Sequence, residues 1–210
     1  MRDALRLQAH TARAQLIART LRDGALNALL WSIDPSERDE FVDELLGIGP
    51  PPPDRDLPRG AVPYLPCSAD AVLEMVEAVP VAAHDELVDI GSGLGRAVML
   101  GHLLSGARAR GIELQHHLVE HARARCDALG LTEIELVHAN AAELELDGSV
   151  FLLYAPCNGA LLEAVLRRIE SVARRRTIVV CTIDLELEHV RWLVRRATAS
   201  TEISIYDARP

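Results

Sequence analysis

A glycine-rich loop is the clearest candidate for chemistry in this sequence. Residues 87–98 read LVDIGSGLGRAV, so an apolar run that ends in Asp89 leads into glycines at positions 91, 93 and 95 and then into a helix-like stretch. Glycine has no Cβ, and alternate glycines let another group approach the backbone closely. We expect that group to be a ligand, although the same glycines also suit a tight turn that binds nothing.

Two common phosphate-binding loops do not fit this stretch. The dinucleotide fingerprint G-x-G-x-x-G uses its third glycine for close packing of helix on strand, and Arg96 occupies that position here. A Walker loop requires Gly-Lys-Ser/Thr, and the chain contains no lysine. A nicotinamide-dependent oxidoreductase is therefore the disfavoured alternative.

Two carboxylates indicate the charge and the hydroxyl groups that the ligand should carry. Asp89 lies on the ligand side of the loop, where it repels a pyrophosphate and attracts a cationic group. Glu113 ends the next expected strand, and a carboxylate there can accept hydrogen bonds from both hydroxyls of a ribose. The ligand should carry a ribose and a positive charge but no phosphate.

The motifs resemble those of the class I S-adenosylmethionine-dependent methyltransferases. VDIGSGLGRAV followed by RGIEL is similar to motifs I and II of that family, and the resemblance covers roughly residues 62–183. The upstream Val62-Pro63-Tyr64-Leu65-Pro66 is similar to the Y-x-P element of protein-lysine methyltransferases of the Dot1 and ATP-synthase-subunit types. The resemblance implies S-adenosyl-L-methionine as the cofactor.

The resemblance also implies roles for single residues. Asp89 supports the methionine end of the cofactor and Glu113 holds its ribose. The loop residues that admit the cofactor are Gly91, Ser92, Gly93 and Gly95. Ala139-Asn140-Ala141 stands where the family usually has Gly-Asp-Ala, so we expect Asn140 and Ala141 at the adenine, with the Asn140 carbonyl accepting an amino hydrogen.

The methyl acceptor is expected at Tyr154-Ala155-Pro156-Cys157-Asn158. Amino-methylating relatives have Asn-Pro-Pro-Tyr or a similar stretch here, and this chain keeps one proline without the leading Asn. Tyr64 and Tyr154 are expected to line the pocket, Cys157 is interpreted as a small buried hydrophobe, and Asn158 as a helix cap or a substrate contact. Alignment supplies much of the rate of such a displacement, so we assign no general base.

An alternation of strands and helices positions these residues. Strands are expected at 86–90, 109–113, 134–138, 149–154, 177–183 and 202–206. Helices are expected at 68–79, 94–104 and 116–129, around 161–169 and near 187–197. This pattern predicts an α/β fold, a Rossmann-like doubly wound and mostly parallel sheet with helices on both faces. A single strand after the last helix departs from the family, which commonly has two.

The first 60 residues differ in character. Apolar spacing predicts one long amphipathic helix over 4–30, and Asp34-Pro35 begins a second helix that ends at Gly47. The proline-rich stretch GPPPPDRDLPRG follows as a spacer. We expect a helical N-terminal extension over 1–60 and a methyltransferase domain over 61–210, the extension covering the acceptor pocket without carrying the cofactor site.

Composition limits the partners. A formal net charge of −9 disfavours nucleic acid as the acceptor, and no apolar stretch approaches the length of a membrane span. The four cysteines are dispersed, so no metal site is indicated. We expect a cytoplasmic enzyme acting on an unidentified protein side chain or small molecule, or alternatively a non-catalytic protein that retains the cofactor fold; the oligomeric state is open.

Overall fold

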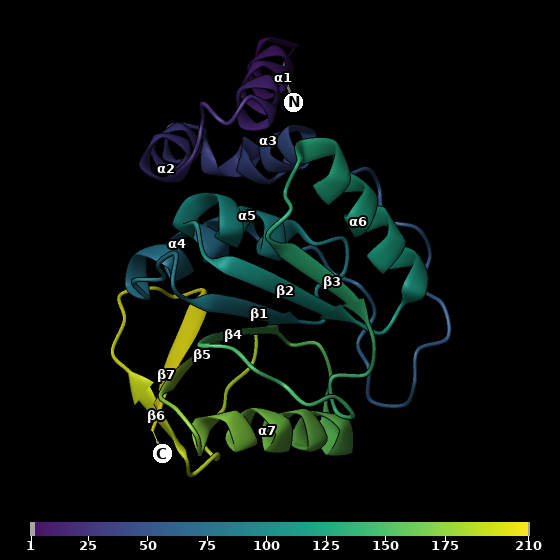
Figure 1. The fold of residues 1–210 in the computed structure, drawn as a ribbon, viewed down its shortest axis with the longest axis vertical. Helices are drawn as coiled ribbons and strands as arrows, with labels where there is room; N and C mark the ends of the chain where they lie inside the picture. Colours follow the sequence, from purple (N-terminus) through teal and green to yellow (C-terminus); the bar gives the residue numbers. More distant parts are fainter. Residues whose placement is uncertain (1–2, 210) are drawn as a thin grey trace.

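The computed structural model describes residues 3–209 and centres on a seven-stranded sheet (Figure 1). The strand order is β3-β2-β1-β4-β5-β7-β6; the first five strands in this order run parallel, and β7 pairs antiparallel with both of its neighbours. The strands span Glu86–Ile90 (β1), Arg108–Glu113 (β2), Ile134–His138 (β3), Val150–Tyr154 (β4), Ile178–Ile183 (β5), Leu193–Arg196 (β6) and Ile203–Ala208 (β7). The predicted Rossmann-like architecture is confirmed.

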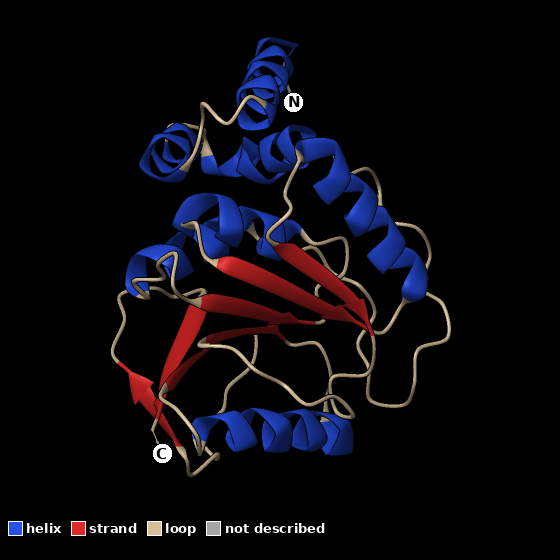
Figure 2. Cartoon of the chain, in the orientation of Figure 1, coloured by secondary structure: helices blue, strands red, loops and turns tan. Residues whose placement is uncertain are grey.

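Helices cover both faces of the sheet (Figure 2). One face carries α4 (Ala69–Ala78), α5 (Arg96–Ser105) and α6 (His116–Leu129), and the other carries α7 (Gly159–Ala173). Successive side chains of a strand point to opposite faces. Leu87 of β1 accordingly joins the hydrophobic cluster of α4 and α5, whereas Val88 and Ile90 join the cluster of α7.

The C-terminal edge differs from the prediction. No helix forms over 187–197; residues 193–196 form β6 instead, so two strands follow β5 where one was expected. Arg196 of β6 pairs with Asp207 of β7, with 3.2 Å between Arg196 Nε and Asp207 Oδ2. The spacing of apolar residues over 187–197 is compatible with a helix or a strand. Pairing with β7 decides in favour of the strand.

The N-terminal helix is also shorter than expected. The stretch 4–30 divides into α1 (Asp3–Ile17) and α2 (Asp23–Trp31), because Arg19 and Asp23 adopt left-handed backbone angles, φ 59° and 46°. The next helix, α3 (Pro35–Leu46), begins and ends as predicted. The Asp34 carboxylate accepts the Ser36 N–H at 2.9 Å, and Gly47 closes the helix at φ 73°.

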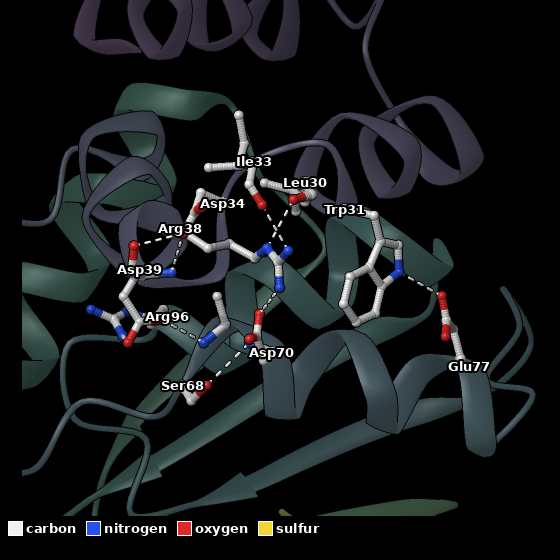
Figure 3. A network of polar contacts seen from close by, with 12 residues as sticks. Leu30, Trp31, Ile33, Asp34, Arg38, Asp39, Ser68, Asp70, Glu77 and Arg96 are labelled. Atoms are coloured by element: carbon white, nitrogen blue, oxygen red, sulfur yellow. Dashed lines mark hydrogen bonds and ion pairs between the residues drawn. The ribbon is translucent and has the colours of Figure 1, made fainter. Parts of the chain in front are cut away.

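These three helices form a further layer over α4 and α5 (Figure 1). Leu30 and Phe41 are fully buried in the same cluster as the helices beneath them. Between the layers, the buried Arg38 donates to the carbonyl oxygens of Leu30 and Ile33 and pairs with Asp70 of α4 (Figure 3). The N-terminal helices thus share a core with the sheet's own helices.

The proline-rich spacer passes beside the start of α6. Gln115, the residue before α6, accepts the Arg55 N–H at 2.7 Å and donates its side-chain amide to Asp54 at 2.7 Å. Asp54 also accepts the N–H of Tyr64 at 3.0 Å. The spacer is therefore fixed to the end of β2. None of the helices within residues 3–209 combines the length and apolar character needed to cross a bilayer.

Candidate functional site

The glycine loop forms a turn between β1 and α5 that is fixed to β2. Gly91, Gly93 and Gly95 all have positive φ, 81°, 53° and 80°. The N–H groups of Gly91 and Ser92 donate to the Ile112 carbonyl at 2.8 and 3.2 Å. The left-handed angles explain why glycine occupies these positions, independently of any ligand.

Close neighbours fill the space beside each of these glycines. A Cβ at Gly93 would overlap the ring of Tyr64, and one at Gly91 would lie 2.7 Å from Cβ of Pro156. A Cβ at Gly95 would lie 3.2 Å from Cβ of Ala122 in α6. Gly93 and Gly95 therefore serve packing, and of the three glycines Gly91 alone lines the cavity described below.

Glu113 clamps the loop to β2. One carboxylate oxygen accepts the Gly93 N–H at 2.9 Å and the other accepts the Gln115 N–H at 2.8 Å. The residue is 7% exposed and borders the cavity. A carboxylate has about four acceptor positions, so each oxygen can accept a further hydrogen bond from a ligand.

Asp89 is a buried carboxylate beneath the loop. It is 4% exposed, and no hydrogen-bond donor within residues 3–209 reaches it. Burial, with a smaller contribution from the charge of Glu113, raises the pKa of Asp89 to about 7. A cationic group stabilises a buried carboxylate, so the surroundings of Asp89 suit a positively charged group.

A cavity lies at the carboxyl ends of the strands and encloses about 890 Å³, part of it open to solvent. Six of the ten predicted site residues line it: Tyr64, Gly91, Glu113, Asn140, Ala141 and Tyr154. The other four, Asp89, Ser92, Gly93 and Gly95, are not among the lining residues. Residues that sequence reasoning did not assign to the site also line it, among them Leu57, Gln115, Leu161 and Asp184.

The Asn140 side chain is engaged locally at the end of β3. Its carbonyl oxygen accepts the Ala142 N–H at 3.0 Å and its amide donates to Glu143 at 2.8 Å. The side-chain oxygen can accept one further hydrogen bond, and Asn140 and Ala141 both line the cavity.

The opposite end of the cavity is formed by two neighbouring strand ends. Tyr154 ends β4 and pairs with Ile183, the last residue of β5. Asp184 directly follows Ile183. Ala155 and Asp184 have left-handed backbone angles, φ 34° and 51°, which non-glycine residues rarely adopt. Burial, followed by the charge and hydrogen bond of Asp184, raises the pKa of Tyr154, so its phenol stays protonated at neutral pH.

The Tyr64 segment is joined to the loop that follows β4. The Val62 N–H donates to the Pro156 carbonyl at 3.1 Å, and the Asn158 N–H donates to the Gly60 carbonyl at 2.8 Å. Cys157 is 5% exposed, and burial raises its pKa to about 11, which agrees with its interpretation as a small hydrophobe. Asn158 precedes α7 at the cap position, but its side chain makes no capping hydrogen bond.

Arg96 connects the loop to the N-terminal helices. It begins α5, is 4% exposed, and donates to the two Asp43 carboxylate oxygens of α3 at 2.9 and 2.6 Å. Its remaining terminal nitrogen donates to the Cys67 carbonyl at 2.7 Å. The guanidinium of Arg96 is therefore committed to α3 and to the segment that precedes α4.

Comparison with known proteins identifies the family, although no family model matches the chain. A protein-L-isoaspartate O-methyltransferase of Methylorubrum populi is 31% identical over 182 residues, which cover 83% of this chain and 79% of that protein. An RNA methyltransferase from Salinibacter ruber, solved with S-adenosyl-L-homocysteine, matches at TM-score 0.57 and 27% identity over 69% of this chain and 92% of that one. An S-adenosylmethionine-dependent methyltransferase from Aquifex aeolicus shares the fold at TM-score 0.53 and 14% identity, over 66% of this chain and 88% of that one.

The charges at the site suit a cofactor of this kind. The unpartnered Asp89 fits a cationic group, and Glu113 at the cavity wall fits a pair of hydroxyls, as a nucleoside with a positively charged side chain requires. The chain therefore belongs to the class I S-adenosylmethionine-dependent methyltransferases, and S-adenosylmethionine is its methyl donor.

Proposed function

We propose that this methyltransferase holds S-adenosylmethionine between the ends of β1, β2 and β3 and methylates a protein side chain that enters beside β4. The observation that carries the cofactor position is the buried Asp89 carboxylate, which has no hydrogen-bond donor among residues 3–209. In this arrangement Asp89 pairs with the cationic methionine portion.

The remaining predicted residues complete the cofactor site. Glu113 accepts the two ribose hydroxyls on its free acceptor positions while it keeps its bonds to Gly93 and Gln115. Asn140 and Ala141 border the adenine. Gly91, Ser92, Gly93 and Gly95 shape the turn, and Tyr64 and Tyr154 border the reacting end.

S-adenosylmethionine supplies an electrophilic methyl group on a sulfonium sulfur. The protein contributes alignment, which can account for about 7–11 kcal/mol of a barrier when the reacting groups are well positioned. Tyr64 and Tyr154 are suited to this task because both are partly buried and keep their protons; burial raises the pKa of Tyr64 to about 12.

Three observations support a protein acceptor. Leu65 lines the cavity and is 58% exposed, so it offers an apolar contact surface to an incoming chain. The name of the Methylorubrum populi relative assigns it a protein substrate. The Val62–Pro66 segment resembles lysine methyltransferases of the Dot1 and ATP-synthase-subunit types, which points the same way.

Calorimetric titration tests the cofactor site. We expect S-adenosylmethionine and S-adenosylhomocysteine to bind and NAD to give no heat. A ligand at about 100 times its dissociation constant should add about 2.7 kcal/mol of stability. Stabilisation by NAD with no response to S-adenosylmethionine would contradict the assignment.

Labelled cofactor tests the acceptor. The enzyme is incubated with methyl-labelled S-adenosylmethionine and either a protein extract or its small-molecule ultrafiltrate. Label in the protein fraction supports the proposal, and transfer confined to the ultrafiltrate contradicts it.

A further inference from the structure

The ionisable side chains that line the cavity have one sign. They include the carboxylates of Glu113 and Asp184, and within residues 3–209 no arginine or histidine belongs to the lining. A guanidinium close to Tyr64 is that of Arg96, which already donates to Asp43 and to the Cys67 carbonyl. The cavity therefore offers anionic groups and neutral hydroxyls to whatever enters it.

The two carboxylates lie too far apart to bind one group. Glu113 ends β2 and Asp184 follows β5, and the sheet order places β1 and β4 between these strands. Neighbouring strands are about 4.7–4.9 Å apart, so three spacings separate the two strand ends by about 14 Å. With Glu113 at the ribose, Asp184 remains for the methyl acceptor.

Asp184 has an aromatic neighbour on the same wall. Tyr154 ends β4 next to it, and the Asp184 carboxylate is close enough to act on the Tyr154 hydroxyl. A carboxylate attracts an ammonium group by charge, and the face of an aromatic ring attracts the same cation. Asp184 lines the cavity and is exposed, so an incoming side chain can reach its carboxylate from solvent.

We propose that Asp184 and Tyr154 form an acceptor subsite for a primary or secondary amine, and that this enzyme methylates nitrogen rather than a carboxylate. The inference rests on the proposed function. The ammonium group of the acceptor first releases one proton to solvent, and the neutral nitrogen then forms the new bond to the methyl carbon with its lone pair. The sulfur–methyl bond breaks and its electron pair stays on sulfur, so the products are S-adenosylhomocysteine and a methylated ammonium group, which keeps its remaining protons at neutral pH.

A carboxylate acceptor finds little support in this cavity. The name of the Methylorubrum populi relative assigns it an isoaspartyl acceptor. Such an anion would meet the carboxylates of Asp184 and Glu113, while the lining formed by residues 3–209 supplies tyrosine hydroxyls and no arginine or histidine. Like charges in one site disfavour each other.

The first experiment identifies the bond that is formed. The wild-type enzyme is incubated with methyl-labelled S-adenosylmethionine and a protein extract, and the product is treated with mild base. Methyl esters release volatile labelled methanol under these conditions, whereas N-methyl groups remain. We expect label that is stable to base. Release of most of the label as methanol would overturn the amine subsite.

The second experiment measures the subsite without turnover. Saturation-transfer NMR with n-butylamine and n-butyrate as probes should show contact for the amine alone. Asp184→Asn should weaken that contact and raise the Michaelis constant for the labelled acceptor about tenfold, since one charge-assisted hydrogen bond is lost. The control Glu163→Gln removes the same charge from the exposed side of α7 and should change neither value.

Cofactor binding separates the two proposals. Calorimetry on Asp184→Asn should give the wild-type affinity for S-adenosylmethionine, because Asp184 is remote from the ribose end. Loss of cofactor binding in the wild type would refute the proposed function. Two outcomes with intact cofactor binding would refute the subsite alone. One is NMR contact with butyrate and none with butylamine, and the other is an Asp184→Asn variant whose amine contact and Michaelis constant equal those of the wild type.

Discussion

Replacing Arg96 by methionine should destabilise the protein by about 2–3 kcal/mol. The Arg96 side chain is 5% exposed and makes a two-pronged ion pair with Asp43, and it also donates to the Cys67 carbonyl. Removing one partner of a buried pair costs about 3–5 kcal/mol, because the other charge is left without compensation. The Asp43 side chain is 31% exposed, so water solvates the remaining carboxylate and lowers the expected cost to about 2–3 kcal/mol.

The loss should depend on pH in a definite direction. Burial raises the pKa of Asp43, and the hydrogen bond and charge of Arg96 offset only part of this effect. Without the guanidinium the folded-state pKa rises further. A carboxyl group with a higher pKa in the folded state binds protons more tightly on folding, so stability falls as pH rises through that range. The deficit of Arg96→Met should therefore be larger at about pH 8 than at about pH 5.

A double-mutant cycle measures the pair directly. Urea unfolding of wild type, Arg96→Met, Asp43→Asn and the double variant gives four free energies, and we expect a coupling of about 1–2 kcal/mol between the two changes. An additive cycle within about 0.3 kcal/mol, or a deficit that is constant with pH, would refute the reasoning. Arg6 and Glu44, an exposed pair 3.9 Å apart, should give a coupling below about 0.5 kcal/mol as the reference.

Three further outcomes follow from the loop. Glu113→Ala should weaken S-adenosylmethionine binding about tenfold to a few hundredfold and also lower the melting temperature, since the carboxylate binds Gly93 as well; Glu113→Gln should lose less in both calorimetry and melting curves. Because the pKa of Asp89 is raised to about 7, cofactor affinity should increase between about pH 6 and pH 8 as the carboxylate ionises, and Asp89→Asn should give a flat profile by titration. Gly93→Ala should cost more than about 1 kcal/mol, as its Cβ meets the Tyr64 ring at φ 53°, whereas Gly24→Ala in open space should be neutral or stabilising in the same unfolding assay.

The elements that carry the site were predictable because each has strong local signals. β1 is a short apolar run that leads into glycines, and α6 is bounded by a polar start and by Gly130 at φ 65°. Asp34, Pro35 and Gly47 likewise specify α3 from one end to the other. In these segments the local preference and the tertiary contacts agree, so periodicity was sufficient.

The errors lie where local preference and tertiary context disagree. Nothing in the apolar spacing of residues 4–30 shows that Arg19 and Asp23 adopt left-handed angles, which depend on the packing of α2 against α5. Residues 193–196 become a strand because β7 offers pairing partners that lie on the other side of a loop. Both outcomes depend on contacts between distant residues, which a single sequence does not display.

Only part of the cavity lining could be predicted from the sequence, because some lining residues depend on contacts between distant segments. Glu113 and Tyr154 end strands, so their meeting at one sheet edge follows from topology. Leu57 and Gln115 carry no such signal, and they reach the lining because the spacer is bonded to the start of α6. Leu57 in the lining is compatible with the expectation that residues 1–60 cover the acceptor pocket, and whether they take part in the cofactor site stays a prediction.

Arg96 shows how a residue that excludes one ligand can serve another purpose. In a dinucleotide loop the third glycine lets helix and strand approach each other. Here α5 makes that approach at Gly101, where a Cβ would lie 2.5 Å from Cδ2 of Leu87 in β1. Position 96 is thus relieved of packing against the sheet, and its long side chain can turn toward Asp43 in α3. Arg96, which argues against a dinucleotide, therefore also connects α3 to the first turn of α5.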